Sequence, residues 1–245
     1  EALDAAPRSV VVDSEGEVFF TATSTSVVAD AIYHIDSDGE VEEVHIADGD
    51  IDDLEIDPRG GLAYSSGTTV YRLRELGMEP EGMANLLFEF YDCFVYYGSS
   101  CRLEVAVDPD GFIRATSRHL GPSAGSKLVL IARDGSLVRF PLNFYCQVGD
   151  LQVAPDGSTL ISCMNGPTRR VWPDGRIQEL EGWHPKCDEP GTYTGGAGIS
   201  VASDGSIFLA DSKCNRISKI DSIYGANAYL GSGTAGYAGD EAGLL

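Results

Sequence analysis

Basic residues are scarce in this 245-residue chain, which carries 17 Lys and Arg against 38 Asp and Glu and a formal net charge of −21. A negative field of this size repels nucleic-acid phosphates and anionic lipid headgroups. We therefore expect no nucleic-acid partner, and the charge favours cations or basic partners instead. Solubility in a salty extracellular medium is the alternative explanation of the same charge.

Long hydrophobic runs and helical periodicity are also missing. No window approaches the 18 consecutive apolar residues of a membrane span, so we expect no membrane insertion. The first residues, EALDAAPRSV, have neither the basic nor the apolar region of a signal peptide, and the expectation is that any such peptide has been removed. The best helix candidate, residues 71–90, is interrupted by Gly77, Pro80 and Gly82, which predicts a long loop with at most one helical turn.

Cysteine–metal motifs are absent as well. None of the six cysteines lies in a CxxC pair or at metal-ligand spacing from a histidine, which argues against zinc. An even number without metal spacing indicates up to three disulfides and an extracellular, periplasmic or cell-surface location. Free buried thiols are the alternative. We expect a Cys93–Cys101 disulfide, because these cysteines flank the short segment FVYYGSS, and the other pairings stay open among the 15 that six cysteines allow.

What the chain does contain is a repeat. Five segments share an alternating apolar run, a turn ending in glycine and a second apolar run, and they read SVVVDSEGEVFFTA, DLEIDPRGGLAYSS, EVAVDPDGFIRATS, DLQVAPDGSTLISC and GISVASDGSIFLAD. The spacings of their turn glycines are 44, 51, 46 and 48 residues, for Gly16, Gly60, Gly111, Gly157 and Gly205. Glycine at the end of a short turn between alternating runs is typical of a β-hairpin.

A second hairpin follows in most units, with turns at Asp38-Gly39, Asp134-Gly135 and Asp174-Gly175. Two hairpins per unit make four antiparallel strands, and this period and strand number predict an all-β fold, a β-propeller of about five four-stranded blades. We expect residues 1–245 to form a single domain. The blades are expected at residues 8–50, 51–101, 102–149, 150–197 and 198–245.

The fifth unit resembles an NHL repeat. The matching residues are Gly198, Ile199, Asp204, Gly205, Ala210, Asp211, Asn215, Arg216, Ile217 and the segment GTAGYAGD at 233–240. The resemblance implies a propeller of five or six blades that serves mostly as an interaction surface. It also implies that the carboxyl-terminal segment leads into the first strand of a next blade, and we expect residues 227–245 to close the propeller onto the blade at 9–46. The alternative is that the chain is a piece of a longer array of blades.

The position seven residues before each turn glycine, which we call the inner-strand position, is acidic in three of the five units. Its residues are Ser9, Asp53, Glu104, Asp150 and Gly198. The start of an innermost strand approaches one mouth of a propeller's central channel, so we expect Asp53, Glu104 and Asp150 to bind Ca²⁺ there. A solvated acidic rim without a cofactor is the alternative.

A metal-dependent, gluconolactonase-like hydrolase or a propeller lyase is the alternative function. In that family, the resemblance implies Glu, Asn and Asp ligands one position before the inner-strand position. The residues here are Arg8, Asp52, Leu103, Gly149 and Ala197, of which Asp52 alone is a possible ligand. Zinc-containing lyases need several histidines near the axis, and the four histidines here are not spaced for that; His184 has the most site-like surroundings.

Two motif matches are expected to be fortuitous. GPSAG at 121–125 lacks the following helix of a hydrolase elbow, and GSGTAG at 231–236 lacks that of a dinucleotide site. In the absence of a catalytic constellation, we expect a non-catalytic, extracytoplasmic propeller that serves as a protein-interaction or scaffold module and has a protein partner.

Overall fold

A computed structural model of the chain describes residues 7–24, 29–76, 78–86, 101–118, 126–144, 146–164, 166–180, 198–221 and 225–231. These residues belong to two compact units. The first contains residues 1–117 and 128–140, and the second contains 118–127 and 141–245. Among the described residues, no helix is long and apolar enough to cross a membrane.

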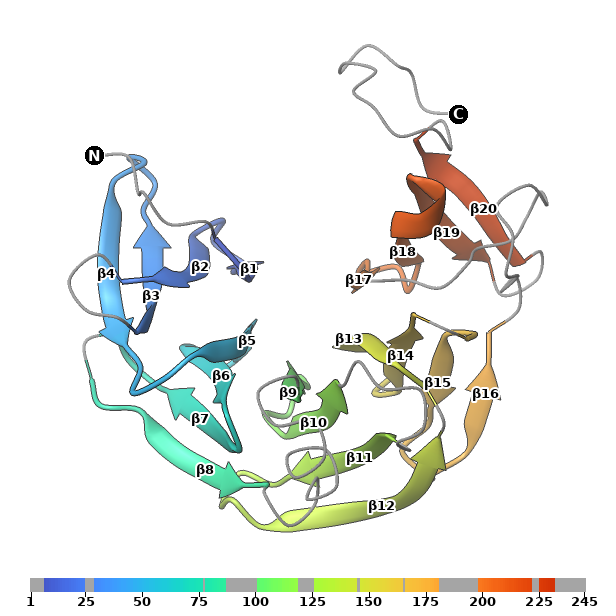
Figure 1. Cartoon of the computed structure of the whole chain (residues 1–245), viewed down its shortest axis with the longest axis horizontal. Helices are drawn as coiled ribbons and strands as arrows, with labels where there is room; N and C mark the ends of the chain where they lie inside the picture. Colours follow the sequence, from blue (N-terminus) through green and yellow to red (C-terminus); the bar gives the residue numbers. More distant parts are fainter. Residues whose placement is uncertain are drawn as a thin grey trace. The chain divides into compact units, whose positions relative to one another are not determined.

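The described residues fold into five four-stranded antiparallel sheets, as the repeat predicted, and in each sheet the strands lie side by side in chain order (Figure 1). The first sheet contains β1 (Val10–Val12), β2 (Val18–Thr23), β3 (Asp30–Ile35) and β4 (Val41–Ile46). The second contains β5 (Ile51–Ile56), β6 (Leu62–Ser66), β7 (Thr69–Leu73) and β8 (Glu81–Asn85). The third contains β9 (Arg102–Val107), β10 (Ile113–Arg118), β11 (Ser126–Ile131) and β12 (Leu137–Phe144).

The fourth sheet contains β13 (Val148–Val153), β14 (Thr159–Cys163), β15 (Arg169–Val171) and β16 (Ile177–Glu179). The fifth contains β17 (Gly198–Val201), β18 (Ile207–Asp211), β19 (Arg216–Asp221) and β20 (Gly225–Leu230), with a single turn of 3₁₀ helix, η2 (Ser212–Cys214), after β18. We call these sheets blades 1 to 5. Blade 4 begins at Val148, two residues before the predicted start of that unit.

The prediction of a long loop over residues 71–90 is wrong. This segment supplies part of β7 and the whole of β8. Gly82 lies inside β8, at a register irregularity opposite Tyr71, and Pro80 lies just before that strand. Glycine and proline interrupt a helix, but at the start or at a bulge of an edge strand both are tolerated.

Aspartate side chains and glycine build the hairpin turns. Between β1 and β2, the Asp13 carboxylate accepts hydrogen bonds from the main-chain N–H groups of Glu15 and Glu17, at 2.8 and 2.9 Å. Gly16 then takes a φ of +88°, which a residue with a Cβ rarely adopts. The turn at Asp36–Gly39 repeats this arrangement, with Gly39 at φ +81°.

In the first unit, neighbouring blades pack through their apolar faces. Phe19 and Ile32 of blade 1 form one buried cluster with Leu54, Leu62 and other residues of blade 2. A second cluster joins Ala63, Val70 and Met83 of blade 2 to residues of blade 3 that include Leu103, Val105 and Ile113. The sheet of blade 2 therefore buries both of its faces, and the inner strands β5 and β9 lie side by side.

The second unit repeats this packing. Leu160 of blade 4 and Leu209 of blade 5 are fully buried in one cluster, together with Ala154, Ile199 and Ile220. The inner strands β13 and β17 contact each other. Successive four-stranded antiparallel blades packed face to face, with their first strands adjacent, constitute a β-propeller fold.

Blade 5 gives the NHL-like residues a structural role. The buried Asp211 carboxylate accepts a hydrogen bond from the Cys214 N–H at 3.3 Å, which caps the 3₁₀ turn. Asn215 follows in the left-handed conformation that asparagine tolerates. Arg216 Nε then lies 3.4 Å from Asp211 Oδ2, so the motif fixes the turn between β18 and β19.

The cysteines are oxidised where the structure describes them. Cys146, two residues before β13, forms a disulfide with Cys163 at the end of β14. Cys101 and Cys214 are also disulfide-bonded, and none of the described cysteines is free. Cys93, the predicted partner of Cys101, lies outside the described residues, as does Cys187.

Candidate functional site

Asp53, the first of the predicted calcium ligands, connects blades. Its Oδ1 accepts a hydrogen bond from the Leu54 N–H at 2.9 Å, and its Oδ2 accepts one from the Val105 N–H of blade 3 at 2.8 Å. The Ser9 hydroxyl of blade 1 lies 3.5 Å from Oδ1. Asp53 is 9% exposed, so these bonds are shielded from solvent and hold β5 against β9.

Asp150 repeats this arrangement in the second unit. Its Oδ1 accepts a hydrogen bond from the Leu151 N–H at 2.7 Å, and its Oδ2 accepts one from the Ile199 N–H of blade 5 at 2.8 Å. The bond to Ile199 crosses from β13 to β17. Asp53 and Asp150, which we call the interblade carboxylates, thus join the first strand of one blade to the first strand of the next.

Glu104, the third predicted ligand, is 5% exposed in β9. Within the described ranges, no group of three or more His, Cys, Asp or Glu side chains is close enough to hold a metal ion. The calcium site formed by Asp53, Glu104 and Asp150 therefore stays a prediction, while two of its members have a visible structural role.

Asp52 lies beside Asp53 in a different setting. The pairing of β5 with β6 passes from Ile51 opposite Ser66 to Asp53 opposite Ser65, which leaves Asp52 as a bulged residue without a partner. Such bulges redirect a side chain, and they are frequent next to active sites. The Asp52 side chain is 10% exposed, and its Oδ2 is buried without a hydrogen-bond partner among the described residues.

The electrostatics of Asp52 follow from this position. Burial raises the pKa of the Asp52 carboxyl to about 6, and the charges of Asp50 and Asp30 act in the same direction. The Leu103 main-chain hydrogen bond and the charge of Arg102, whose Nε lies 4.0 Å from Oδ1, oppose the rise of this pKa. Asp52 is thus a carboxylate that changes protonation close to neutral pH.

Asp30 was not singled out from the sequence, yet it is a central residue of blade 1. Its Oδ2 accepts hydrogen bonds from Arg8 Nη1 at 2.7 Å and from the Ile51 N–H at 2.9 Å, and the residue is 1% exposed. It therefore connects β3 to the start of β5. Asp30 begins a third strand rather than a first one, so no repeat position identifies it.

Two of the four histidines lie within the described residues, His34 in β3 and His45 in β4. His34 stacks on Phe19 with 4.8 Å between ring centres, and its Nε2 lies 3.1 Å from Glu17 Oε2. His45 Nε2 lies 2.9 Å from the Tyr64 hydroxyl, and burial lowers the pKa of His45 against the charges of Glu79 and Asp48. His184, the GPSAG motif and most of GSGTAG lie outside the described residues, as does most of the segment 227–245 expected to close the propeller.

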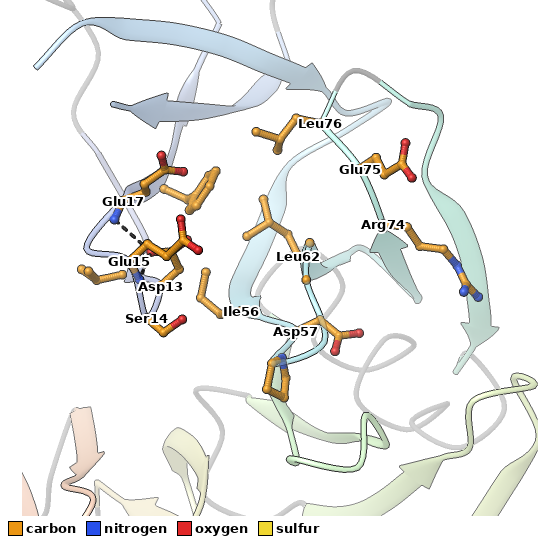
Figure 2. A pocket seen from close by; sticks show the side chains of 15 residues that line it. Asp13, Ser14, Glu15, Glu17, Ile56, Asp57, Leu62, Arg74, Glu75 and Leu76 are labelled. Atoms are coloured by element: carbon orange, nitrogen blue, oxygen red, sulfur yellow. Dashed lines mark hydrogen bonds between the residues drawn. The ribbon is translucent and has the colours of Figure 1, made fainter. Parts of the chain in front are cut away.

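A cavity of about 710 Å³ lies between blades 1 and 2 of the first unit, near the turns that end β1 and β5 (Figure 2). The turn between β1 and β2 lines one side with Asp13, Ser14, Glu15 and Glu17. Apolar side chains from both blades line the interior, and the rest of the lining comes from the turn after β5 and the segment after β7. These residues are Asp57, Pro58, Gly60, Gly61, Arg74, Glu75 and Leu76. Its volume is that of a small-molecule site.

Comparison with known proteins gives the fold a context. No family model matches the chain, and no curated protein matches it in sequence. Many solved structures resemble the chain, among them three that match it across most of its length. Virginiamycin B lyase from Staphylococcus aureus is 18% identical, with a TM-score of 0.66 over 93% of this chain and 70% of that one.

Regucalcin from Agrobacterium tumefaciens, described as a calcium-binding protein, is 12% identical, with a TM-score of 0.63 over 91% of this chain and 72% of that one. A candidate gluconolactonase is 17% identical, with a TM-score of 0.62 over 94% of this chain and 83% of that one. At these identities the likeness supports the β-propeller fold and leaves membership of the NHL-repeat family as a prediction.

Proposed function

We propose that the chain is an extracytoplasmic β-propeller that binds a ligand or protein partner without transforming it. The observation that carries this proposal is the use of the interblade carboxylates. Asp53 and Asp150 each accept main-chain N–H groups from their own strand and from the next blade. A carboxylate engaged in this way stabilises the fold and has fewer lone pairs for a metal ion or a substrate proton.

The location proposed for the protein follows from its cysteines. Cys101, Cys146, Cys163 and Cys214 are all disulfide-bonded. Disulfides form and persist in secreted, periplasmic and cell-surface proteins, whereas cytosolic thiols are kept reduced. The charge of −21 favours a partner with a basic surface, because complementary charge speeds association and disfavours acidic competitors.

A metal-dependent hydrolase or lyase is the second candidate function, and Asp52 favours it. Asp52 occupies the ligand position implied by the gluconolactonase-like resemblance, and one of its oxygens is buried without a hydrogen-bond partner in the described part of the chain. The names of the similar structures, a lyase, a calcium-binding regucalcin and a candidate gluconolactonase, support the same candidate.

The residues described around Asp52 do not complete a calcium site. Ca²⁺ takes six to eight oxygen ligands, and one carboxylate supplies at most two. The equivalent positions in the other blades hold Arg8, Leu103, Gly149 and Ala197, whose side chains offer no oxygen. The fit is therefore partial, and we derive no catalytic step through a metal.

Thermal melts after chelator treatment, with and without millimolar Ca²⁺, test the two candidates. For the binding function we expect Asp53→Asn to melt lower than the wild type in both conditions, because the variant loses a charged acceptor of main-chain N–H groups. We also expect Ca²⁺ to change the melting temperatures of the wild type, Asp52→Asn and Asp53→Asn by the same small amount.

Two other outcomes contradict this expectation, and each identifies its own site. A Ca²⁺ stabilisation lost in Asp53→Asn and kept in Asp52→Asn would support the calcium site of Asp53, Glu104 and Asp150. A Ca²⁺ stabilisation lost in Asp52→Asn, together with Asp52-dependent hydrolysis of a lactone, would support the enzyme. A ligand that binds only the native state at 100 times its Kd raises stability by about 2.7 kcal/mol, which a melt detects readily.

A further inference from the structure

The lining of the cavity between blades 1 and 2 combines apolar side chains with the buried Asp57, whose carboxylate is paired with Arg72 at 2.9 Å. Phe19 and Leu62 are buried beneath it, at 6% and 1% exposure, and both belong to the core cluster that joins the two blades. Ile56 lines the same side. Val12 and Leu76 line the opening and remain 58% and 43% exposed, so apolar surface continues from the core to the mouth of the cavity. Burial of this exposed surface by a ligand is favourable.

One wall of the cavity is acidic. The turn between β1 and β2 presents the carboxylates of Asp13, Glu15 and Glu17 (Figure 2). Asp13 is engaged by the main chain of its own turn, and Glu17 lies beside His34. The exposed Glu15 carboxylate contacts no basic side chain among the residues that the structure describes. The wall therefore carries negative charge that the surrounding protein only partly compensates.

The basic side chain of the lining, Arg74, does not neutralise this wall. Its Nη2 and Nε lie 2.8 and 3.1 Å from Glu81 Oε2, a residue of β8 outside the cavity. Figure 2 shows the Arg74 guanidinium directed away from Glu15 and Glu17. The Arg74 charge is thus paired with Glu81 and not with the acidic wall.

We infer that this cavity binds a small organic cation, an ammonium or guanidinium group on an apolar body. The apolar body would lie against the exposed side chains of Val12 and Leu76, and the cationic group would lie at Glu15 and Glu17. The volume of about 710 Å³ is within the range of small-molecule sites, which combine an apolar lining with a few placed polar groups. This inference rests on the binding function proposed above and adds the class of ligand.

The test is an NMR titration of the full chain with 4-phenylbutylammonium and with 4-phenylbutyrate, two probes of similar shape and opposite charge. We expect saturable binding of the ammonium probe with a Kd on the order of 1 mM or tighter, as ligand efficiency allows for its size. The carboxylate probe should bind at least about tenfold more weakly, because it meets the acidic wall. Shifted amides should cluster at the turns that line the cavity.

Matched variants locate the site. In Glu15→Gln/Glu17→Gln we expect the ammonium probe to bind about five- to tenfold more weakly, since each partly exposed charge pair contributes up to about 1 kcal/mol. Glu40→Gln/Glu42→Gln, an equally spaced pair of exposed residues on the second hairpin of the same blade, removes the same charge and should leave the affinity unchanged. Leu76→Ala should weaken both probes.

Equal affinity for the two probes, or equal loss of binding in the two double variants, would overturn the inference. Either result leaves the binding function of the propeller intact with another ligand class. The binding function itself fails on a different measurement, turnover of a substrate that depends on Asp52.

Discussion

The first strands of blades 2 and 4 share a register bulge and differ in the residue that lies on it. Both contain a bulge, at Asp52 in β5 and at Gly149 in β13. The next residue in each strand, Asp53 or Asp150, accepts the N–H of the following blade at 2.8 Å. The carboxylate after the bulge is thus common to the two blades, whereas the carboxylate on the bulge occurs in one of them.

This difference separates an acid that both blades use to bond to the next blade from an acid that only blade 2 carries. Because blade 4 folds with glycine at the bulge, an acid there is not a requirement of the blade. Asp52 nevertheless keeps a buried carboxylate whose pKa is raised to about 6, a cost to folding that blade 4 avoids. This property of Asp52 supports the second candidate function proposed above.

A second difference concerns covalent support. In blade 4, Cys146 and Cys163 flank the bulge and form a disulfide across a separation of 17 residues. The equivalent residues in blade 2 are Gly49 and Ser66, with the same spacing. The bulge that carries Asp52 therefore lacks the cross-link that restrains the bulge at Gly149.

Removal of this cross-link is expected to have the largest effect. Cys146→Ser/Cys163→Ser should lower the free energy of unfolding by about 3 kcal/mol, because a disulfide across a loop of this length restricts the unfolded chain by about that amount. Denaturant unfolding of the variant measures the loss.

The reciprocal variant Gly49→Cys/Ser66→Cys tests whether the two bulges are equivalent. A Cβ at Gly49 would lie 3.5 Å from the Ser66 hydroxyl, so the site has the geometry for a bridge without a clash. We expect spontaneous oxidation, seen as unchanged free-thiol content, and a higher unfolding midpoint. Two extra alkylatable thiols in the oxidised protein would show that the bulges differ.

Loss of an interblade carboxylate is expected to have the next largest effect on the free energy of unfolding. Asp53→Ala and Asp150→Ala should each lower the free energy of unfolding by about 2 to 3 kcal/mol, since buried N–H groups lose their acceptor. Asp38→Ala, on an exposed turn, removes the same charge and should change stability by less than about 0.5 kcal/mol. Similar losses at Asp53 and Asp150, measured by denaturant unfolding, would confirm one shared role, and a neutral Asp150→Ala would contradict it.

The sequence was sufficient to predict the blades. Turn glycines at regular spacing and alternating apolar residues reflect local backbone requirements, so five four-stranded sheets followed from Gly16, Gly39 and their equivalents. The hydrogen bonds that Asp53 and Asp150 accept from the next blade were not predicted, because an acid beside the channel and an acid bonded to the next blade have the same sequence spacing. The calcium site at the same position stays a prediction.

Other features could not be predicted from the chain alone. Asp30 acts through Ile51 and Arg8, about twenty residues away in each direction, and no repeat position identifies it. The Cys146–Cys163 pair depends on the register of β13 and β14. The cavity between blades 1 and 2 depends on how two sheets pack, which periodicity within one sheet does not encode.

A smaller effect, of opposite sign, is expected at Asp52. The native pKa of about 6 exceeds the ordinary value of 3.8, so the native state binds the proton more tightly than the unfolded chain. The stability contributed by the protonated group is complete below about pH 4 and is lost as the pH rises through about 6. Asp52→Asn should therefore be more stable than the wild type near neutral pH, by on the order of 1 to 2 kcal/mol, and equal to it near pH 4. Unfolding curves across this pH range measure the difference. An equal offset at both pH values would contradict the titration.

The smallest effect is expected at Gly198, which occupies in blade 5 the position of Asp53 and Asp150. A Cβ on this residue would lie 3.8 Å from the Ala210 Cβ and 3.8 Å from Asp150 Oδ2, which is ordinary contact. Gly198→Ala should therefore be neutral or stabilising by up to about 1 kcal/mol, because alanine restricts the unfolded chain more than glycine does. Gly198→Asp would bring a second carboxylate next to Asp150, and like charges at this separation repel, so this variant should unfold at lower denaturant than Gly198→Ala. The order of the unfolding midpoints, with Gly198→Ala at or above the wild type and Gly198→Asp below both, can be measured with three proteins. If Gly198→Asp were as stable as Gly198→Ala, Asp150 would not require an uncharged neighbour, and the absence of an acid from this position in blade 5 would have no electrostatic cause.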